Sequence, residues 1–286
     1  MAFDLTVAKR MARASDVAYY IGAAGGTTTC GFYGDVGFVK ETPLALVSKT
    51  INAALVGTTA TEVIVAFRGT LAINTKDTDG LADSILDWGN DAEAVLDERP
   101  YTTGSVHHGF ADSLDQIWDQ LAPAISAQVQ KSGLPVVFTG HSKGGALASL
   151  GALRLEHELG ISASDVYTFA SPRPGNSQFA RDYNVHFPDH WRVEYADDLV
   201  PHLPSGLMLL SLLAQVNPRF SHLSSRGYSP VGNLRFIDWD GVMNSGDSFV
   251  LDIKRLDHFA KLAAAGQLVK VANDHSLEKA YLPNLT

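Results

Sequence analysis

The chain has 286 residues, of which 45% are hydrophobic and 19% are charged, and its formal net charge at pH 7 is −9. This composition excludes a disordered chain, which needs low hydrophobicity and a high density of charge. A negative field repels phosphate backbones, so we expect no nucleic acid partner. The single cysteine, Cys30, excludes an intramolecular disulfide and every zinc site that needs two or more cysteines.

Neither end of the chain nor its interior carries a clear membrane signal. The first residues, MAFDLTVAKRMARASDVAYY, are amphipathic and charged throughout, without the apolar run of a signal peptide. The longest apolar stretch, 206–216, is shorter than the roughly 20 residues of a spanning helix. We therefore expect a soluble protein, either cytoplasmic or secreted without a recognisable signal peptide. Removal of a signal from a longer precursor stays open.

Short apolar strands alternate with helical patterns along the chain. The expected order is strand 63–67, helix 112–129, strand 135–139, helix 142–159, strand 165–170, helix 176–183 and strand 191–195. Apolar runs that are continuous are typical of a mainly parallel sheet with helices on both faces, an α/β fold. No linker or repeat divides the chain, so we expect a single domain over 1–286. Ligands of such sheets bind at the carboxyl ends of the strands.

The segment Gly140-His141-Ser142-Lys143-Gly144 fits the nucleophile elbow G-x-S-x-G. It follows an expected strand and opens an expected helix, which is the context in which this motif carries chemistry. The turn is tight, and larger residues two positions before and after the serine would collide, which explains Gly140 and Gly144. The helix N-terminus favours negative charge beside Ser142. Ser142 is therefore the candidate nucleophile.

A serine nucleophile needs a base and a carboxylate that orients the base, in the chain order Ser, Asp or Glu, His. The loop after strand 191–195 holds Asp197 and Asp198, and both qualify by position. A turn-forming role is the alternative for either of them.

Four histidines follow this loop, namely His202, His222, His258 and His275. His202 lies too close to the acidic loop to act as an independent third member, and we expect a structural role for it. His222 lies in a polar loop without a positional argument. His258 and His275 both remain as candidate bases.

Several motifs in collinear order resemble the class 3 lipases, the filamentous-fungal lipase-like α/β hydrolases. The resemblance covers about half of the chain. It is carried by Phe67-Arg68-Gly69-Thr70, Asp87-Trp88-Gly89-Asn90-Asp91, Val106-His107-His108-Gly109-Phe110, the run from Gly140 to Ala148, the run from Thr168 to Asn176, and Asp198-Leu199-Val200-Pro201-His202-Leu203-Pro204.

The resemblance implies an α/β-hydrolase fold and assigns roles within it. The D-x-V-P register favours Asp198 as the acid. A histidine that is followed by an aromatic residue near the C-terminus favours His275 as the base. Thr70 and Lys143 would supply the backbone N–H groups of the oxyanion hole. Asp91 stands where the family has an acid that holds the oxyanion-loop hydroxyl, with an ordinary exposed aspartate as the alternative.

The remaining assignments concern residues around these positions. We expect His141 to be a buried, hydrogen-bonded histidine next to the site. Lys143 departs from the apolar residue usual in the family, and we expect its side chain to shape the acyl pocket or its entrance. The segment 71–87 occupies the family's lid position, with a plain surface loop as the alternative. The apolar segment 205–216 is a second cap candidate, with buried core as the alternative.

The resemblance implies a serine carboxylester hydrolase, most typically a triacylglycerol lipase, that forms an acyl-enzyme and needs no metal or organic cofactor. Phospholipase A1, feruloyl esterase and short-chain esterase are alternatives on the same fold, and a non-catalytic interaction protein is an alternative of another class. The expected partner is a small or lipid ester, with contact to a lipid–water interface as a further expectation. The lack of disulfides suits a bacterial member. The sequence indicates no oligomeric state.

Overall fold

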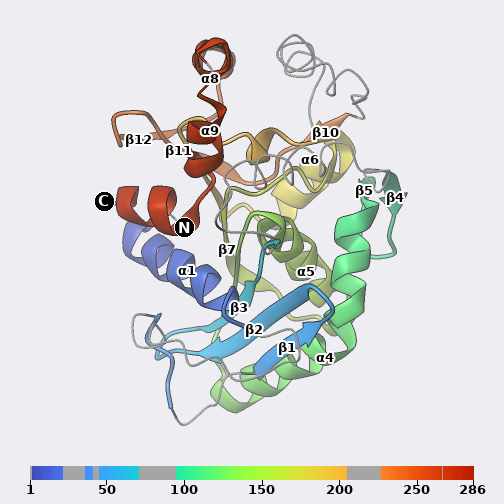
Figure 1. Cartoon of the computed structure of the whole chain (residues 1–286). Coiled ribbons are helices and arrows are strands. Elements are labelled where there is room, and N and C mark those ends of the chain that lie inside the picture. Colours follow the sequence, from blue (N-terminus) through green and yellow to red (C-terminus); the bar gives the residue numbers. More distant parts are fainter. Residues whose placement is uncertain (1, 22–35, 41–44, 71–94, 205–226, 266) are drawn as a thin grey trace.

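The computed structural model of the protein describes residues 2–21, 36–40, 45–70, 95–204, 227–265 and 267–286. Figure 1 shows how the elements of these residues are arranged. In chain order they are α1 (Leu5–Ala18), β1 (Ala45–Lys49), β2 (Asn52–Thr58), β3 (Val63–Phe67), β4 (Leu96–Glu98), β5 (Ser105–His107), α4 (His108–Ser132), β6 (Val136–His141), α5 (Lys143–Leu159), β7 (Ala163–Phe169), β8 (Gly175–Asn176), α6 (Ser177–His186), β9 (His190–Tyr195), η1 (Val200–His202), β10 (Tyr228–Ser229), β11 (Asn233–Ile237), β12 (Met243–Ser245), α8 (Phe249–Ala264), α9 (Leu268–Asp274), η3 (Leu277–Tyr281) and α10 (Leu282–Asn284).

The main sheet of the described residues has eight strands in the order β1-β2-β3-β6-β7-β9-β11-β12. Its five central strands, from β3 to β11, are parallel. The edges are antiparallel, where β1 pairs with β2, β2 with β3, and β12 with β11. The expected mainly parallel sheet is confirmed. Every residue of β3 and β6 is buried, which explains the continuous apolar runs 63–67 and 136–138 within them.

The predicted elements have close counterparts in the structure, and the largest difference concerns α4. The helix predicted over 112–129 begins at His108, directly after β5, and ends before Gly133, whose φ of 68° terminates it. Strands β1, β2, β11 and β12 were not predicted. They form the antiparallel pairs β1–β2 and β11–β12, and β11 also pairs in parallel with β9. β1, β11 and β12 are short and carry polar residues, so the run of apolar residues that marks a central strand is missing from them, whereas β2 is buried along its whole length.

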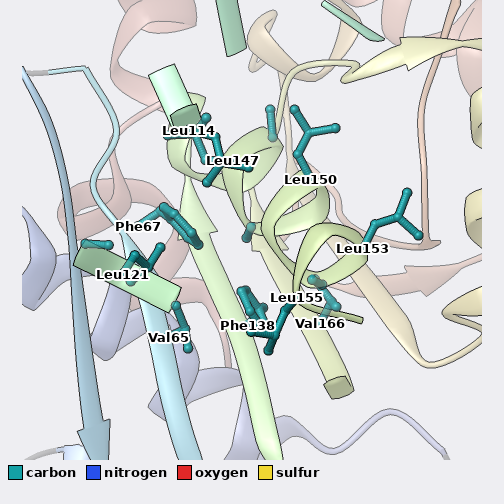
Figure 2. Close-up of a cluster of buried hydrophobic side chains, with 14 of the residues drawn as sticks. Val65, Phe67, Leu114, Leu121, Phe138, Leu147, Leu150, Leu153, Leu155 and Val166 are labelled. Atoms are coloured by element: carbon teal, nitrogen blue, oxygen red, sulfur yellow. The ribbon is translucent and has the colours of Figure 1, made fainter. Parts of the chain in front are cut away.

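Helices cover both faces of the sheet (Figure 1). α1 packs on β3, β6 and β7, while α4 and α5 pack on the opposite face. Two hydrophobic clusters result. The first lies under α4 and α5, and Figure 2 shows Phe67 and Phe138 of the sheet together with Leu114, Leu147 and Leu150 of the helices. The second lies under α1, where Tyr281 of the C-terminal segment joins the side chains of α1 and the sheet.

A second sheet of the described chain has the order β10-β8-β5-β4 and lies near the N-terminus of α4. Across the described ranges, no helix combines the length and the hydropathy that a membrane crossing requires. The lid candidate 71–87 and the cap candidate 205–216 lie outside the described residues. The expectation of one domain over 1–286 stays a prediction.

The aromatic pair Phe67 and Phe138 yields a stability prediction. Phe138 is fully buried, and its ring stacks on that of Phe67 with 6.2 Å between the centroids. We expect Phe138→Ala to lower the free energy of unfolding by about 3–5 kcal/mol, because it removes apolar contacts and leaves a cavity between sheet and helices. Denaturant unfolding followed by circular dichroism measures the change. Val185→Ala, at a side chain that is 79% exposed, is the control and should stay within about 0.5 kcal/mol of the parent. Equal losses in both variants would contradict the prediction.

Candidate active site

Ser142 occupies a strained turn between β6 and α5. Its φ of 58° and ψ of −134° are unusual for a residue with a side chain. The turn also needs glycine on both sides. A Cβ atom on Gly140 would lie 2.1 Å from the carbonyl oxygen of Gly144, and one on Gly144 would lie 2.3 Å from the carbonyl oxygen of Phe67. These close approaches place Ser142 at the N-terminus of α5, where the helix dipole favours a developing negative charge.

The structure brings Ser142, Asp198 and His275 together from three distant segments. Nε2 of His275 lies 3.0 Å from Oγ of Ser142. Nδ1 of the same ring lies 3.1 Å from each carboxylate oxygen of Asp198. All three residues are buried. A histidine placed between a hydroxyl and a carboxylate can take the hydroxyl proton while the carboxylate stabilises the resulting imidazolium.

The carboxylate of Asp198 is held by two further donors. The hydroxyl of Tyr281 donates to Oδ2 at 2.6 Å, and the backbone N–H of Val200 donates to Oδ1 at 3.0 Å. The Tyr281 hydroxyl in turn accepts the N–H of Tyr195 at 3.2 Å. Burial raises the pKa of Tyr281 well above its ordinary value, and the negative charge of Asp198 adds to the rise. The phenol therefore stays protonated and keeps Asp198 in place.

His141 connects the backbone of His275 to helix α1. Its Nε2 lies 2.8 Å from the carbonyl oxygen of His275, and its Nδ1 lies 2.7 Å from the hydroxyl of Tyr19, at the C-terminal end of α1. A carbonyl oxygen only accepts, so Nε2–H donates to it and Nδ1 accepts the tyrosine proton. Burial lowers the pKa of His141 well below its ordinary value, with a further contribution from His275. His141 is thus a neutral, hydrogen-bonded histidine next to the site.

The two candidates that the sequence left open, Asp197 and His258, pair with each other. Nδ1 of His258 lies 2.7 and 2.9 Å from the two carboxylate oxygens of Asp197. The His258 ring packs against Trp239 with 4.7 Å between the centroids, and Nζ of Lys270 lies 4.0 Å from Asp197. The adjacent acids 197 and 198 therefore contact different histidines, and the Asp197–His258 pair joins α8 to the loop after β9.

Asp274 precedes His275 and faces the same loop. Its Oδ2 accepts the backbone N–H of Asp197 at 3.4 Å. Burial raises the pKa of the Asp274 carboxyl to about 6; the charges of Asp197 and Asp198 add to the rise, while the hydrogen bond and Lys270 oppose it. His202 is half-buried, and its loss of hydration together with the charge of Arg255 lowers its pKa well below the ordinary value. His202 is consistent with the structural role expected for it.

A pocket of about 170 Å³ opens beside the turn at Ser142. It is lined by Ile51, Thr70, His107, Gly109, Phe110, Ser113, Lys143, Pro172, Leu203 and Pro204. Both residues of the expected oxyanion hole, Thr70 and Lys143, thus lie on its wall. Among the described residues, Oγ1 of Thr70 is buried and has no hydrogen-bond partner. Asp91, the residue expected to hold it, lies outside the described part of the chain, as does His222.

The sequence did not single out several residues that support the site. Tyr19 comes from α1, and Asn52, whose Oδ1 accepts from Nζ of Lys143 at 2.6 Å, comes from β2. No local pattern marks them, since each contact joins segments far apart in the chain. Tyr281 could have been identified from the sequence, because an aromatic residue after His275 is part of the resemblance. Its hydrogen bond to Asp198 was not predicted.

Comparisons with known proteins agree with this geometry. The model of the family described as Lipase (class 3) matches residues 64–208, just over half of the chain. A lipase of Caenorhabditis elegans is 40% identical over 114 residues, which are 39% of this chain and 32% of the worm protein. A lipase of Rhizomucor miehei is 37% identical over 128 residues, which are 43% of this chain and 35% of the fungal protein.

A solved structure of a triacylglycerol lipase, whose catalytic centre is formed by a serine protease triad, is 27% identical to this chain. It superposes with a TM-score of 0.57 over 82% of this chain and 78% of the solved one. This chain belongs to the class 3 lipase family, and its mainly parallel sheet is that of the α/β-hydrolase fold. The matched segments span about a third of the length of the worm and fungal relatives.

The two histidine–aspartate pairs predict different consequences for two substitutions. We expect His275→Ala to lower kcat for a p-nitrophenyl ester by roughly 10⁵–10⁶-fold, because removing the base costs about as much as removing the nucleophile. His258→Ala is the matched comparison and should cost less than about tenfold, since it removes only a hydrogen-bonded contact between α8 and the loop. Initial rates of nitrophenolate release measure both. Loss of turnover in His258→Ala with turnover retained in His275→Ala would identify His258 as the base.

The raised pKa of Asp274 predicts a pH-dependent stability. Between its ordinary pKa near 3.8 and about 6, the folded carboxyl keeps a proton that the unfolded chain has lost. Stability is therefore lost as pH rises through this range and levels off above it. We expect Asp274→Asn to reduce this pH-dependent loss in the free energy of unfolding by on the order of 2–3 kcal/mol. Denaturant unfolding from pH 4 to pH 8 measures it, with the exposed Asp240→Asn as control. A loss of the same size in Asp274→Asn and the parent would refute the assignment.

Proposed function

We propose that this protein is a serine carboxylester hydrolase of the triacylglycerol lipase type. The observation that carries the proposal is the hydrogen-bonded series Ser142–His275–Asp198 at the N-terminus of α5, beside a pocket whose wall includes Thr70 and Lys143. The class 3 lipase family and the lipases among the relatives support the choice of a lipid ester as substrate.

The proposed reaction has two steps. In the first, Oγ of Ser142 attacks the ester carbonyl carbon, its proton passes to Nε2 of His275, and His275 then gives the proton to the departing alcohol. In the second, water attacks the acyl-enzyme while His275 takes the water proton, and the acid leaves as the serine proton is restored. Asp198 orients the ring and stabilises the imidazolium in both steps.

Backbone N–H groups would stabilise the negative charge of the tetrahedral intermediate. The N–H groups of Thr70 and Lys143 would bind the oxyanion, and the N-terminus of α5 adds a favourable field. Loss of one such donor typically costs about 2.7–4 kcal/mol of transition-state stabilisation. The positive φ of Ser142 supports this assignment, since it is the strained backbone of a nucleophile elbow, in which the N–H after the nucleophile serves the oxyanion.

Substitution of the proposed nucleophile tests the function. We expect the parent to hydrolyse p-nitrophenyl esters and emulsified triacylglycerol, and Ser142→Ala to lower kcat by roughly 10⁵–10⁶-fold, because the covalent step is lost. Ser126→Ala, in the middle of α4 and away from the pocket, is the matched control and should leave the rate unchanged. Titration of released acid measures triacylglycerol hydrolysis, and nitrophenolate absorbance measures the model esters.

The choice of substrates separates the alternatives. Activity on phosphatidylcholine without activity on triacylglycerol would make the protein a phospholipase A1. A rate that falls beyond short acyl chains would make it an esterase, and methyl ferulate as the preferred ester would make it a feruloyl esterase. Equal rates for Ser142→Ala and the parent, or no hydrolysis of any of these esters by the parent, would overturn the proposal in favour of a non-catalytic interaction protein.

A further inference from the structure

The hydroxyl of Tyr19 lies between two parts of the site that the proposed reaction uses. It lies 2.7 Å from Nδ1 of His141, whose Nε2 lies 2.8 Å from the carbonyl oxygen of His275. The same hydroxyl lies against Gly69, the residue before Thr70, because a Cβ atom on Gly69 would come within 2.1 Å of it. Tyr19 therefore contacts the end of β3, which leads into the expected oxyanion residue, and connects through His141 to the backbone of the proposed base.

Helix α1 holds Tyr19 at this place. Tyr19 is the C-terminal cap of α1, and the helix packs on β3, β6 and β7 and contacts η3. Within this interface Oγ of Ser15 lies 3.0 Å from Oγ1 of Thr139, which precedes His141 by two residues in β6. Oγ1 of Thr139 also lies 3.3 Å from the carbonyl oxygen of Met11. The helix is thus attached to the strand that leads into the nucleophile turn, and its end keeps a defined distance from His141.

The protonation states of both partners fit the direction of this hydrogen bond. Burial raises the pKa of Tyr19, and the charge of Asp16 adds to the rise. Arg68 and a hydrogen bond with the backbone of Gly69 oppose the rise without outweighing burial. The phenol therefore keeps its proton and donates it. Because burial keeps His141 neutral, its Nδ1 accepts from the phenol while its Nε2–H stays available for the backbone carbonyl.

The proposed base is held at two points. Asp198 holds the ring of His275, and His141 holds its backbone carbonyl. This carbonyl lies at the end of α9, where backbone oxygens lack partners within the helix, so the bond from His141 fixes the backbone from which the ring projects. Without a donor at Nδ1, the His141 ring would be free to rotate. The distance of 3.0 Å between Nε2 of His275 and Oγ of Ser142 would then be less well defined.

We infer that Tyr19 is a positioning residue of the reaction, which holds His141 and thereby fixes the backbone of His275, so that the base keeps its distance from the nucleophile. The inference rests on the proposed function, since it takes His275 as the base and Ser142 as the nucleophile. Tyr19 acts through His141 rather than on the ester. Its contact with Gly69 means that one hydroxyl sets the base relative to the end of β3.

Removal of this hydroxyl tests the inference in the full chain. Tyr19→Phe should lower kcat for p-nitrophenyl butyrate by about 10- to 100-fold, because Nδ1 of His141 loses its donor and the base is misplaced. KM should change by less than about twofold, since Tyr19 lies outside the pocket wall formed by the described residues. Tyr20→Phe makes the same change at the neighbouring residue, which is 43% exposed, and should leave both constants unchanged. Titration of Ser142 with a phosphonate counts the competent molecules, and circular dichroism compares the folds.

A double-mutant cycle tests whether the hydroxyl acts through His141. His141→Gln can still donate to the carbonyl oxygen of His275 but lacks the Nδ1 acceptor, so it should lower kcat about as much as Tyr19→Phe does. Adding Tyr19→Phe to His141→Gln should lower kcat by less than about a further twofold, because the connection is already broken.

Three results would overturn the inference: parent kcat in Tyr19→Phe or in His141→Gln, a rise in KM with kcat unchanged, or the same fold-loss from Tyr19→Phe in both backgrounds. If the parent shows no Ser142-dependent hydrolysis of any ester, the proposed function fails instead.

Discussion

The close contact of α5 with the ends of β3 and β6 is the constraint on which the site depends. The backbone of Gly144 packs against the carbonyl of Phe67, at a distance that leaves no room for a Cβ atom. This contact fixes the start of α5 over the sheet and forces Ser142 into a backbone conformation with positive φ. Strand β3 continues into Arg68 and Thr70, so Thr70, the expected oxyanion residue, lies on the wall of the pocket beside the Ser142 turn.

The strain at this turn is balanced by packing on both sides of the sheet. Beneath it, the rings of Phe67 and Phe138 stack within the first hydrophobic cluster. Arg68 is buried, and its guanidinium donates to the carbonyl oxygens of Ile21 and Ile51, which ties the end of β3 to two neighbouring segments. A rigid surrounding of this kind is what allows a sparsely populated backbone conformation to persist.

Sequence patterns were informative wherever the physical cause is local. Gly140 and Gly144 bracket Ser142 because of a steric requirement within five residues, and the continuous apolar run of 63–67 reflects burial of one strand on both faces. The choice between His258 and His275 had no local cause, because it depends on how α8 and α9 pack against the loop after β9. The resemblance favoured His275, and its contact with Ser142 follows that preference.

The polar partners of the site could not be predicted from the sequence either, because each contact joins segments that are far apart in the chain. No sequence pattern marks Asn52 and Gln116. They form a hydrogen bond only because β2 and α4 lie side by side. Tyr19 directly follows the amphipathic helix α1. The periodicity of this helix in the sequence does not specify where it docks on the sheet. The place of Lys143 after Ser142 predicted a side chain at the acyl pocket or its entrance, but nothing in the sequence predicted its burial or the amide of Asn52 that accepts from its ammonium group.

The hydrogen bonds of His141 have a consequence for the route that protons can take. The ring centroids of His141 and His275 lie 4.8 Å apart, so two imidazoles lie side by side next to the proposed nucleophile, Ser142. Both nitrogens of His141 are already engaged, one as a donor to the backbone of His275 and the other as an acceptor from Tyr19. His141 therefore has no lone pair to offer, while Nε2 of His275 faces Ser142. In the proposed reaction the Ser142 proton can therefore pass only to His275 of these two histidines.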